Sequence, residues 1–436
     1  MIGIIGAGIS GLSLAYFLEK QQIPYVLLEA GSGVGGYIQT MHLPGYILEL
    51  GPNSILADEE TEAFMDELGL AQERLLSRDV SKYRYIYRRG KYRKLPTNPV
   101  KLIFSGYFSA ATKWAVFQEM RKPAEVHPGE TLSHFFSRRF SPEVVAYALD
   151  PFVSGIYAGD PAQLLLEKTF PNLQSFEQEY GSVIRGFIKT RSESRRSSYN
   201  FRQGMEALPL AISRHLRGLH LETRVEHVSR LDPGYRLHTP AAAFDVDAFV
   251  VASSASASQD YLKNIFPEFS RSLEAVYYPP MVVIHSAYGR QQVRHALNGF
   301  GGLHPKAEQP FTAGSIWTSS VFEGRCPADQ VLFTSFVGGS QYVENTRYSE
   351  DEIAQKVHQE LARNYQITGK PVFQQAFRWE KAIPQYDEGV LEAHRLAETL
   401  ENERLFVCAN WKDGVSLGDA IKKAKKLADK LVALTA

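Results

Sequence analysis

Three glycines near the start of the chain have a spacing that could hold a phosphorylated ligand. They are Gly6, Gly8 and Gly11, in the pattern G-x-G-x-x-G. In such a pattern the first glycine makes a tight turn from a strand into a helix. The second lets a diphosphate reach backbone N–H groups, and the third lets the helix pack closely. Because the N-terminus of a helix attracts negative charge, the spacing predicts a site for the diphosphate of a dinucleotide.

The elements needed to position these glycines surround them. An apolar run at residues 2–5 predicts a buried strand, apolar side chains at helical spacing over 12–18 predict a helix, and residues 25–28 predict a second strand. Glu29 ends that strand, where a carboxylate can accept hydrogen bonds from a ribose diol. The combination predicts an adenine dinucleotide as the ligand.

The residues after this unit favour FAD over NAD. Gly35 and Gly36 follow a loop rather than a second strand–helix unit, and Gly51 opens a turn that could bring backbone against an isoalloxazine ring. This continuation resembles that of flavin-containing amine oxidases and their relatives, although Tyr37 stands where those relatives usually carry Arg. We therefore predict FAD as the cofactor.

Two later segments are predicted to return to the same cofactor. The segment "AFDVDAFVVASSA" (243–255) predicts a strand that ends in small residues, and Val225 before it could meet the adenine edge. Near the C-terminus, Gly414 lies where the last helix is expected to begin, followed by Val415 and Ser416. The positive end of that helix could point at the N1–C2=O region of the flavin and stabilise its anionic reduced form.

A cationic stretch lies at residues 82–94, "KYRYIYRRGKYRK". It holds seven basic residues, four tyrosines and no acid. Its alternation predicts a hairpin that turns at Gly90 and places Arg84 and Arg88 on the same face. Two interpretations stay open at this point: a solvated edge hairpin, or one or two arginines that bind a carboxylated ligand through bidentate contacts.

The stretch "DPFVSGIYAGDP" (150–161) combines apolar residues with two glycines between Asp-Pro pairs. We expect it to be neither helix nor strand, because proline resets the chain at each end and Gly155 and Gly159 permit unusual backbone angles. Its apolar residues, Phe152 among them, would belong either to a buried loop or to the wall of a site for a flat apolar ligand. Residues 130–149 are expected to be helical up to this stretch.

Composition narrows the classes of function. The 436 residues suggest two or three domains, and 48 basic against 48 acidic residues disfavour nucleic acid as a partner. The two cysteines indicate a reducing compartment, and no histidine or cysteine spacing indicates a metal site. No apolar run is long enough to span a membrane. We expect a cytoplasmic protein, at most peripheral on the inner face of the cell membrane.

Two helical segments complete this outline. Residues 57–77 predict a helix with one apolar face. Residues 95–120 are aromatic and amphipathic, which leaves core packing and a membrane interface as equal alternatives.

Nearly the whole chain resembles one family, the flavin-dependent porphyrinogen oxidases of the protoporphyrinogen oxidase type. The most specific segment is "DPFVSGIYAGDPAQLLLEKTFPNL" (150–173). The others are "KYRYIYRRGKYRKLPTNP" (82–99), "GPNSIL" (51–56), "SSVFEGRCP" (319–327), "WEKAIPQYDEG" (379–389) and "NWKDGVSLGDAI" (410–421).

The resemblance implies an α/β fold: a Rossmann-type FAD-binding domain, a substrate-binding α+β domain and a helical membrane-associating insertion. The implied domains are a discontinuous FAD-binding domain (1–80, 201–270 and 395–436), a helical substrate-lining domain (81–200) and a substrate-binding domain (271–394). The resemblance further implies that Arg84 binds a substrate carboxylate, that Phe152 and Gly155 line the cavity, with Gly155 close to a pyrrole ring, and that Trp379 contacts the cofactor.

The implied reaction is the six-electron oxidation of protoporphyrinogen IX to protoporphyrin IX in haem biosynthesis, with flavin N5 accepting hydride and O2 as final acceptor. Electron-rich pyrroles drive hydride loss themselves, so no catalytic residue is expected. His42 and His394 are expected to be structural, and Cys408 is not expected to link the flavin. Coproporphyrinogen III, an amine oxidase or desaturase activity, and a flavoprotein without net redox remain as alternatives. Ferrochelatase is the expected recipient of the product, and a homodimer is left open.

Overall fold

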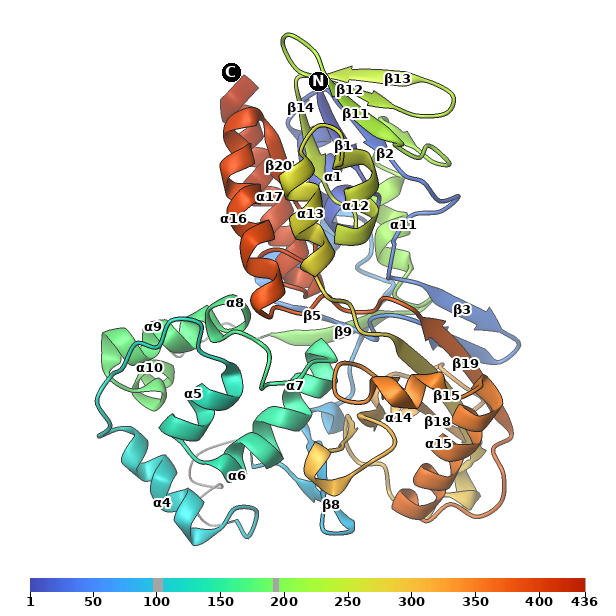
Figure 1. Cartoon of the computed structure of the whole chain (residues 1–436). Coiled ribbons are helices and arrows are strands. Elements are labelled where there is room, and N and C mark those ends of the chain that lie inside the picture. The colour runs from blue at the N-terminus through green and yellow to red at the C-terminus, as the bar shows by residue number, and fades with distance from the viewer. Residues whose placement is uncertain (97–104, 191–195, 436) are drawn as a thin grey trace.

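The structure is a computed structural model that describes residues 1–96, 105–190 and 196–435. Its first unit is a five-stranded parallel sheet in the order β10-β2-β1-β14-β20 (Figure 1). The strands are β1 (Ile2–Ile5), β2 (Tyr25–Leu28), β10 (Leu219–His220), β14 (Ala248–Val251) and β20 (Leu405–Val407). Helix α1 (Ile9–Lys20) follows β1 as predicted, and α17 (Leu417–Thr435) packs against it.

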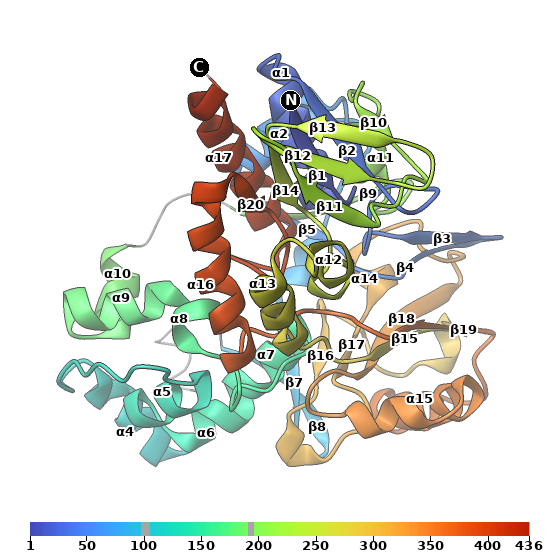
Figure 2. The same ribbon diagram turned by 45° about the horizontal axis from the view of Figure 1, so that its top comes forward.

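Alternate residues of the parallel strands face two different hydrophobic cores. Ile4 and Val250 pack with α1, α17 and α11 (Ala207–Ser213). Val26 and Phe249 pack instead with a three-stranded antiparallel sheet, β11 (His227–Arg230), β12 (Tyr235–His238) and β13 (Ala243–Val246). Figure 2 shows this second sheet lying across the parallel one, with α12 (Ala255–Leu262), α13 (Pro267–Ser272) and α16 (Leu391–Leu400) nearby. Because both faces are covered, β1, β2, β14 and β20 are almost wholly apolar, whereas the short edge strand β10 carries the exposed His220.

The second unit is a seven-stranded sheet in the order β19-β15-β18-β17-β16-β7-β8. Its strands are β7 (Arg84–Arg88), β8 (Lys91–Lys94), β15 (Met281–Gly289), β16 (Gly301–Leu303), β17 (Gly314–Ile316), β18 (Gln330–Gly338) and β19 (Phe373–Trp379), and α15 (Glu350–Tyr365) packs on it. The predicted hairpin at Gly90 is confirmed as β7–β8, with β8 at the edge. It joins the sheet through β16, which runs parallel to β7 and pairs Gly301 with Arg84.

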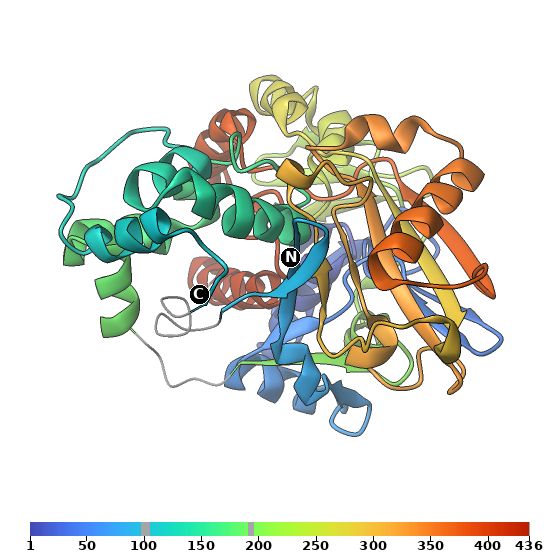
Figure 3. The same ribbon diagram turned by 90° about the horizontal axis from the view of Figure 1, so that it is seen from below.

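The third unit is a lobe of helices beside this sheet. It comprises α4 (Ala110–Glu119), α5 (Leu132–Arg139), α6 (Pro142–Val144), the π-helical turn η2 (Val145–Leu149), α7 (Asp150–Tyr157), α8 (Leu166–Thr169), α9 (Pro171–Tyr180) and α10 (Val183–Lys189). Seen from below, the lobe lies on one side of the molecule and the seven-stranded sheet on the other (Figure 3). The buried Arg139 guanidinium holds the lobe together, because it pairs with Glu119 and Glu177 from two other helices.

Short strands connect the three units. They are the ribbon β3 (Thr40–Leu43) and β4 (Tyr46–Glu49) and the sheet formed by β5 (Ile55–Ala57), β9 (Ser197–Phe201) and β6 (Arg74–Leu76). The prediction of one helix over 57–77 is wrong. Helix α2 (Glu59–Glu67) ends before Gly69, whose φ of +75° suits a helix C-terminus, and the chain then enters β6.

The prediction of an irregular segment at 150–161 is also wrong. Asp150 to Tyr157 form α7, which continues from η2 without a break. Pro151 is tolerated because it lies in the first turn of α7, directly after the wider π-helical turn, where its missing N–H breaks no α-helical bond. The helix ends at Ala158, which adopts a left-handed φ of +51°. The single helix predicted over 130–149 is divided instead into α5, α6 and η2, because the Ser141 side chain caps a new helix by accepting from Val144 N–H.

No helix within the described ranges is both long and apolar enough to cross a bilayer. Part of the amphipathic stretch predicted at 95–120, residues 97–104, lies outside the described residues.

Candidate cofactor and substrate site

The glycine turn between β1 and α1 has the geometry of a diphosphate cradle. Gly6 has a φ of +110°, and a Cβ on Gly11 would lie 2.0 Å from the Gly6 carbonyl oxygen, so neither position accepts a side chain. A Cβ on Gly8 would meet no atom within 4 Å. Gly8 caps α1 without a side-chain hydrogen bond, which leaves the first N–H groups of the helix available to a ligand.

The Glu29 carboxylate is fixed beside this turn by two backbone groups. Ala7 N–H donates to Oε2 at 2.7 Å, and Gly31 N–H donates to Oε1 at 2.8 Å. Each carboxylate oxygen keeps a second lone pair, which can accept from a ribose hydroxyl. Thr223 N–H donates to the Glu29 carbonyl at 2.7 Å, so the segment that carries the buried Val225 runs past this carboxylate.

The second glycine pair predicted to contact the cofactor, Gly35 and Gly36, packs against the glycine turn between β1 and α1. Gly35 forms an isolated parallel bridge with Gly8, and its N–H donates to the Ala7 carbonyl at 2.9 Å. Both Gly35 and Gly36 have positive φ, +108° and +58°. A Cβ on Gly36 would make only an ordinary contact with the Gly8 Cα at 3.4 Å, whereas a Cβ on Gly35 would lie 2.8 Å from the Ile38 carbonyl oxygen, so Gly35 is the position that lacks space for a side chain.

The turn at Gly51 is packed tightly against the loop that carries Tyr37. A Cβ on Gly51 would lie 1.9 Å from the Tyr37 carbonyl oxygen. Trp379 Nε1–H donates to the Leu50 carbonyl at 2.7 Å, and the Trp379 and Tyr37 rings lie 5.0 Å apart. The Tyr37 hydroxyl donates to the Lys381 carbonyl, and burial raises the pKa of Tyr37 to about 12. Tyr37 therefore acts here as a neutral packing residue that joins two predicted cofactor contacts.

The C-terminal turn before α17 is held by Tyr386. The Tyr386 hydroxyl accepts from Gly414 N–H at 2.7 Å and donates to the Asn410 carbonyl at 2.8 Å. Gly414 has a φ of +110°, and the half-buried Val415 follows it. The Ser416 hydroxyl donates to Asp419 Oδ2 at 2.6 Å and accepts from Asp419 N–H, so Ser416 caps the helix.

Hydrogen bonds from Trp411 and Lys423 also stabilise the turn before α17. Trp411 Nε1–H donates to the Ser253 carbonyl at 3.1 Å, which joins the turn to the end of β14. The Lys423 ammonium donates to the Ala409 carbonyl at 2.6 Å and to the Lys412 carbonyl. Burial lowers the pKa of Lys423. The predicted small residues after β14 and the predicted turn before α17 are thus brought together.

The titratable residues considered for chemistry have structural partners. His394 is buried, its Nε2 lies 2.7 Å from the Trp411 carbonyl oxygen, and burial lowers its pKa. His42 Nε2 lies 2.9 Å from Glu206 Oε1. Burial raises the pKa of the Cys408 thiol to about 11, which makes it a poor nucleophile. In the part of the chain that the structure describes, no group of His, Cys, Asp and Glu could hold a metal ion.

Where the sequence predicted substrate-binding residues, α7 exposes one apolar face. Phe152 and Ile156 are 41% and 47% exposed, and Gly155 lies between them on the same face. A Cβ on Gly155 would lie 2.7 Å from Cδ2 of Leu303, a residue of β16. The protein itself therefore fills the space next to Gly155, in addition to any ligand that approaches it.

Arg84 lies on β7, which β16 joins to this face. Leu303 contacts Gly155 from one end of β16, and Gly301 pairs with Arg84 at the other. The Arg84 guanidinium lies over the Phe300 ring at 4.7 Å and has no ion-pair partner among the described residues. Arg88, predicted to share its face, is instead buried and paired with Glu143. Arg84 is thus the better placed of the two to bind a carboxylate.

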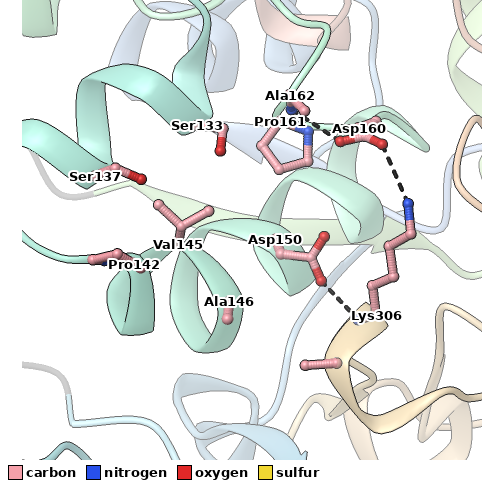
Figure 4. Close-up of a pocket in the computed structure, with 11 residues that line it drawn as sticks. Ser133, Ser137, Pro142, Val145, Ala146, Asp150, Asp160, Pro161, Ala162 and Lys306 are labelled. Carbon is pink, nitrogen blue, oxygen red and sulfur yellow. Dashed lines mark hydrogen bonds and ion pairs between the residues drawn. The ribbon is translucent and has the colours of Figure 1, made fainter.

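A separate cavity of about 380 Å³ lies behind the start of α7 (Figure 4). Ser133, Ser137, Asp160 and Lys306 line it, together with Asp150. Lys306 Nζ lies 3.5 Å from Asp160 Oδ2, and Lys306 N–H donates to Asp150 Oδ2. None of the predicted substrate-binding residues is among those that line this cavity, so it does not mark the predicted site.

Comparison with known proteins identifies the family. The sequence model of the flavin containing amine oxidoreductases matches residues 9–432. Protoporphyrinogen oxidase 2 of Arabidopsis thaliana, a chloroplastic and mitochondrial protein, is 30% identical over 99% of this chain and 93% of its own length. The chain belongs to the protoporphyrinogen oxidase branch of this family. The human protoporphyrinogen oxidase is 28% identical over 98% of this chain and 97% of its own.

Solved structures confirm the fold of this protoporphyrinogen oxidase family member. A protein from Exiguobacterium sp. 255-15, assigned to the protoporphyrinogen oxidases, superposes with a TM-score of 0.81 at 22% identity, over 99% of this chain and 98% of its own. A putrescine oxidase variant superposes with a TM-score of 0.71 at 16% identity, over 99% and 98%. The predicted α/β FAD-binding fold is therefore confirmed, the cofactor is FAD, and the protein is an FAD-dependent oxidase.

Sequence analysis did not single out several residues that hold this site. Tyr386 and Trp411 lie inside segments quoted for the family resemblance, yet their hydrogen bonds depend on contacts with distant strands. Lys423 lies one turn into α17 and gives no signal in the sequence, because a lysine on a helix is most often solvated. Only the contact of its ammonium with two carbonyls distinguishes it.

Proposed function

We propose that the protein oxidises protoporphyrinogen IX to protoporphyrin IX in haem biosynthesis, with O2 as acceptor and H2O2 as product. The observation that carries this proposal is the open apolar face of α7, connected through β16 to Arg84, which has no ion pair among the described residues. A porphyrinogen is a large apolar macrocycle whose charges are peripheral carboxylates, so it needs an apolar wall with a cation at its rim. The curated relatives named protoporphyrinogen oxidase support the same choice.

Each proposed site residue has a defined task. The glycine turns at Gly6, Gly8, Gly11, Gly35 and Gly36 would leave room for the diphosphate, and Glu29 would accept from the ribose. Gly51, Val225, Trp379 and the turn Gly414–Ser416 would enclose the adenine and ring ends of FAD. When bound, FAD supplies the hydride acceptor for a bridging carbon of the macrocycle.

The substrate residues would act by position. Phe152 and Gly155 would lie against the macrocycle and exclude water, and Arg84 would bind a propionate through charge-assisted hydrogen bonds. No acid or base of the chain is assigned to the reaction. The domain division given by the sequence is kept as part of this proposal, with the hairpin of residues 84–94 assigned to the substrate-binding sheet that it pairs with.

Coproporphyrinogen III is the second candidate, because it carries four carboxylates and the hairpin offers more cations. Lys91 and Lys94 at the β8 edge are exposed, and Lys94 lies over the Tyr83 ring. An amine substrate is less well served by the site, since a cationic amine would be repelled by Arg84.

The test is turnover of each pure porphyrinogen, followed by porphyrin fluorescence with oxygen present. We expect a higher kcat/KM with protoporphyrinogen IX. A clearly higher value with coproporphyrinogen III would assign the second substrate, and turnover of amines alone would assign the protein to another branch.

We also propose that the protein is cytoplasmic and contacts the inner face of the membrane through α4. Trp114 and Phe117 are 60% and 44% exposed and stack at 5.6 Å, which suits an interfacial contact. Flotation with anionic vesicles tests this, and a protein that stays with the soluble fraction would contradict it. Transfer of the product to a ferrochelatase would follow from the same pathway and can be tested by co-purification. A homodimer is a separate proposal, tested by the mass of the purified protein in solution.

A further inference from the structure

A buried polar cluster joins the turn at Gly51 to the substrate-binding sheet. It consists of Glu49 at the end of β4, Asn200 in β9, and Arg325 in the loop before β18. All three side chains are buried, and Arg325 is only 1% exposed. The proposed function gives none of them a task, and Arg325 lies within the segment "SSVFEGRCP" (319–327).

Asn200 is the centre of the cluster. Its Nδ2 donates to Glu49 Oε1 at 3.0 Å and to the Asn53 carbonyl at 2.8 Å. Its Oδ1 accepts from Arg325 Nη2 at 3.2 Å. The amide therefore lies with its oxygen toward a cation and its nitrogen toward an anion. A rotated amide would place like partial charges together at both ends, so the two charged residues fix its orientation.

That orientation controls the turn proposed to face the cofactor. The second N–H of Nδ2 reaches the backbone of Asn53, and the Asn53 side chain in turn donates to the Gly51 carbonyl at 3.2 Å. Arg325 Nη2 also donates to the Phe201 carbonyl. The cluster thus connects the Gly51–Asn53 turn to β9 and to the seven-stranded sheet.

The two charges compensate each other through the amide rather than by direct contact. The Glu49 carboxylate accepts from Met205 N–H and Thr40 Oγ1, and burial raises its pKa. Arg325 forms no ion pair within 4 Å among the described residues, and its Nε and Nη1 have no partner. Loss of either charge would leave the other buried and uncompensated, which is strongly unfavourable.

We propose that Arg325 is a positioning residue for the cofactor: it orients Asn200, which holds the Gly51–Asn53 turn, and it neutralises Glu49. This inference depends on the proposed placement of FAD beside Gly51. One other titratable group faces Glu49, the ring of His285 against its backbone. Burial lowers the pKa of His285 to about 4, so this ring is neutral at the pH values of the test.

The test compares FAD affinity between pH 5.5 and 8.5 in the wild type, Arg325→Met, and the double variant Arg325→Met with Glu49→Gln. In Arg325→Met, Glu49 has a raised pKa in the folded protein and no cation near it. Ionisation of this uncompensated carboxylate as the pH rises would disturb Asn200 and the Gly51–Asn53 turn, so the FAD-binding conformation is favoured at low pH and disfavoured at high pH. We expect FAD to bind about tenfold more weakly at pH 8.5 than at pH 5.5, a change that corresponds to one pKa unit.

The double variant should remove this pH dependence and recover most of the affinity, because no buried charge remains. Arg325→Lys keeps the charge but loses the planar fork, so it should keep a flat pH profile while binding FAD several-fold more weakly. If Arg325→Met does not fold, the Lys and double variants carry the test.

A flat profile in Arg325→Met, or a double variant no better than the single one, would overturn the proposal. So would a pH-dependent stability without any change in FAD affinity. None of these measurements uses a porphyrinogen, so a wrong substrate assignment would not affect them.

Discussion

The glycine turn that precedes α1 and the exposed face of α7 are built in opposite ways. In the turn, consecutive backbone groups form the proposed site, and side chains are excluded because Gly6 and Gly11 have no space for them. At α7, side chains form the proposed site, and they come from strands and helices that are far apart in the sequence. A site formed by backbone groups requires glycines that have no side chain. A site formed by side chains requires distant parts of the chain to pack together. The two should therefore respond differently to substitution.

The largest effect is expected in the turn. In Gly11→Val, the new Cβ would lie 2.0 Å from the Gly6 carbonyl oxygen, so α1 must move away from β1. We expect the purified protein to carry almost no FAD, measured as the ratio of flavin absorbance to protein absorbance. Gly33→Ala is the matched control, because a Cβ there meets nothing within 4 Å, and it should retain the full FAD content.

The next effect is expected at the rim of the α7 site. Arg84→Ala removes an arginine that lies on the strand paired with β16 and has no ion pair among the described residues, and a charge-assisted hydrogen bond contributes about 1.5–3 kcal/mol. The KM for the porphyrinogen should rise about 10- to 100-fold with little change in kcat. Lys91→Ala, on the same hairpin, should leave KM nearly unchanged. An unchanged KM in Arg84→Ala would show that Arg84 does not bind the substrate.

A smaller effect is expected at position 155, and it distinguishes whether Leu303 or the bound substrate leaves no space for a side chain there. Gly155→Ala would press on Leu303 at 2.7 Å and should raise KM several-fold. If packing is the cause, Leu303→Ala in the same chain should restore KM, as a double-mutant cycle measures. If the ligand itself occupies that space, the double variant should stay as weak as Gly155→Ala.

The smallest effect is expected for a side chain in the FAD-binding unit. Hydrogen bonding to Lys422 lowers the pKa of Asp58 to about 2, and Asp58 also caps α2 by accepting from Thr61 N–H. Asp58→Asn keeps a capping side chain but loses the charge paired with Lys422, so it should lower the free energy of unfolding by at most about 1 kcal/mol near neutral pH. Because the folded pKa lies below the ordinary value, this difference should persist above about pH 4 and shrink as the pH falls toward 2. Urea denaturation at several pH values measures it.

The features set by local sequence could be predicted, whereas those that depend on contacts between distant segments could not. The strands β1 and β2, helix α1 and the hairpin at Gly90 were predicted correctly because local sequence determines them. Helix α7 was missed because Asp-Pro usually breaks a helix, and a π-helical turn cannot be recognised from composition. The proximity of Arg84 to Gly155 depends on the parallel pairing of β7 with β16, which are more than 200 residues apart in the chain. No local pattern encodes such a pairing.

The π-helical turn η2 has a consequence for how this site could change. It holds one more residue per turn than an α-helix would need, directly before α7. Deleting one residue from an ordinary α-helix rotates everything after it by about 100°. Here a deletion within 145–149 would instead convert the wide turn into an α-helical turn, so α7 would keep its orientation. The segment before α7 can therefore lose one residue while Phe152 and Ile156 stay on the exposed face.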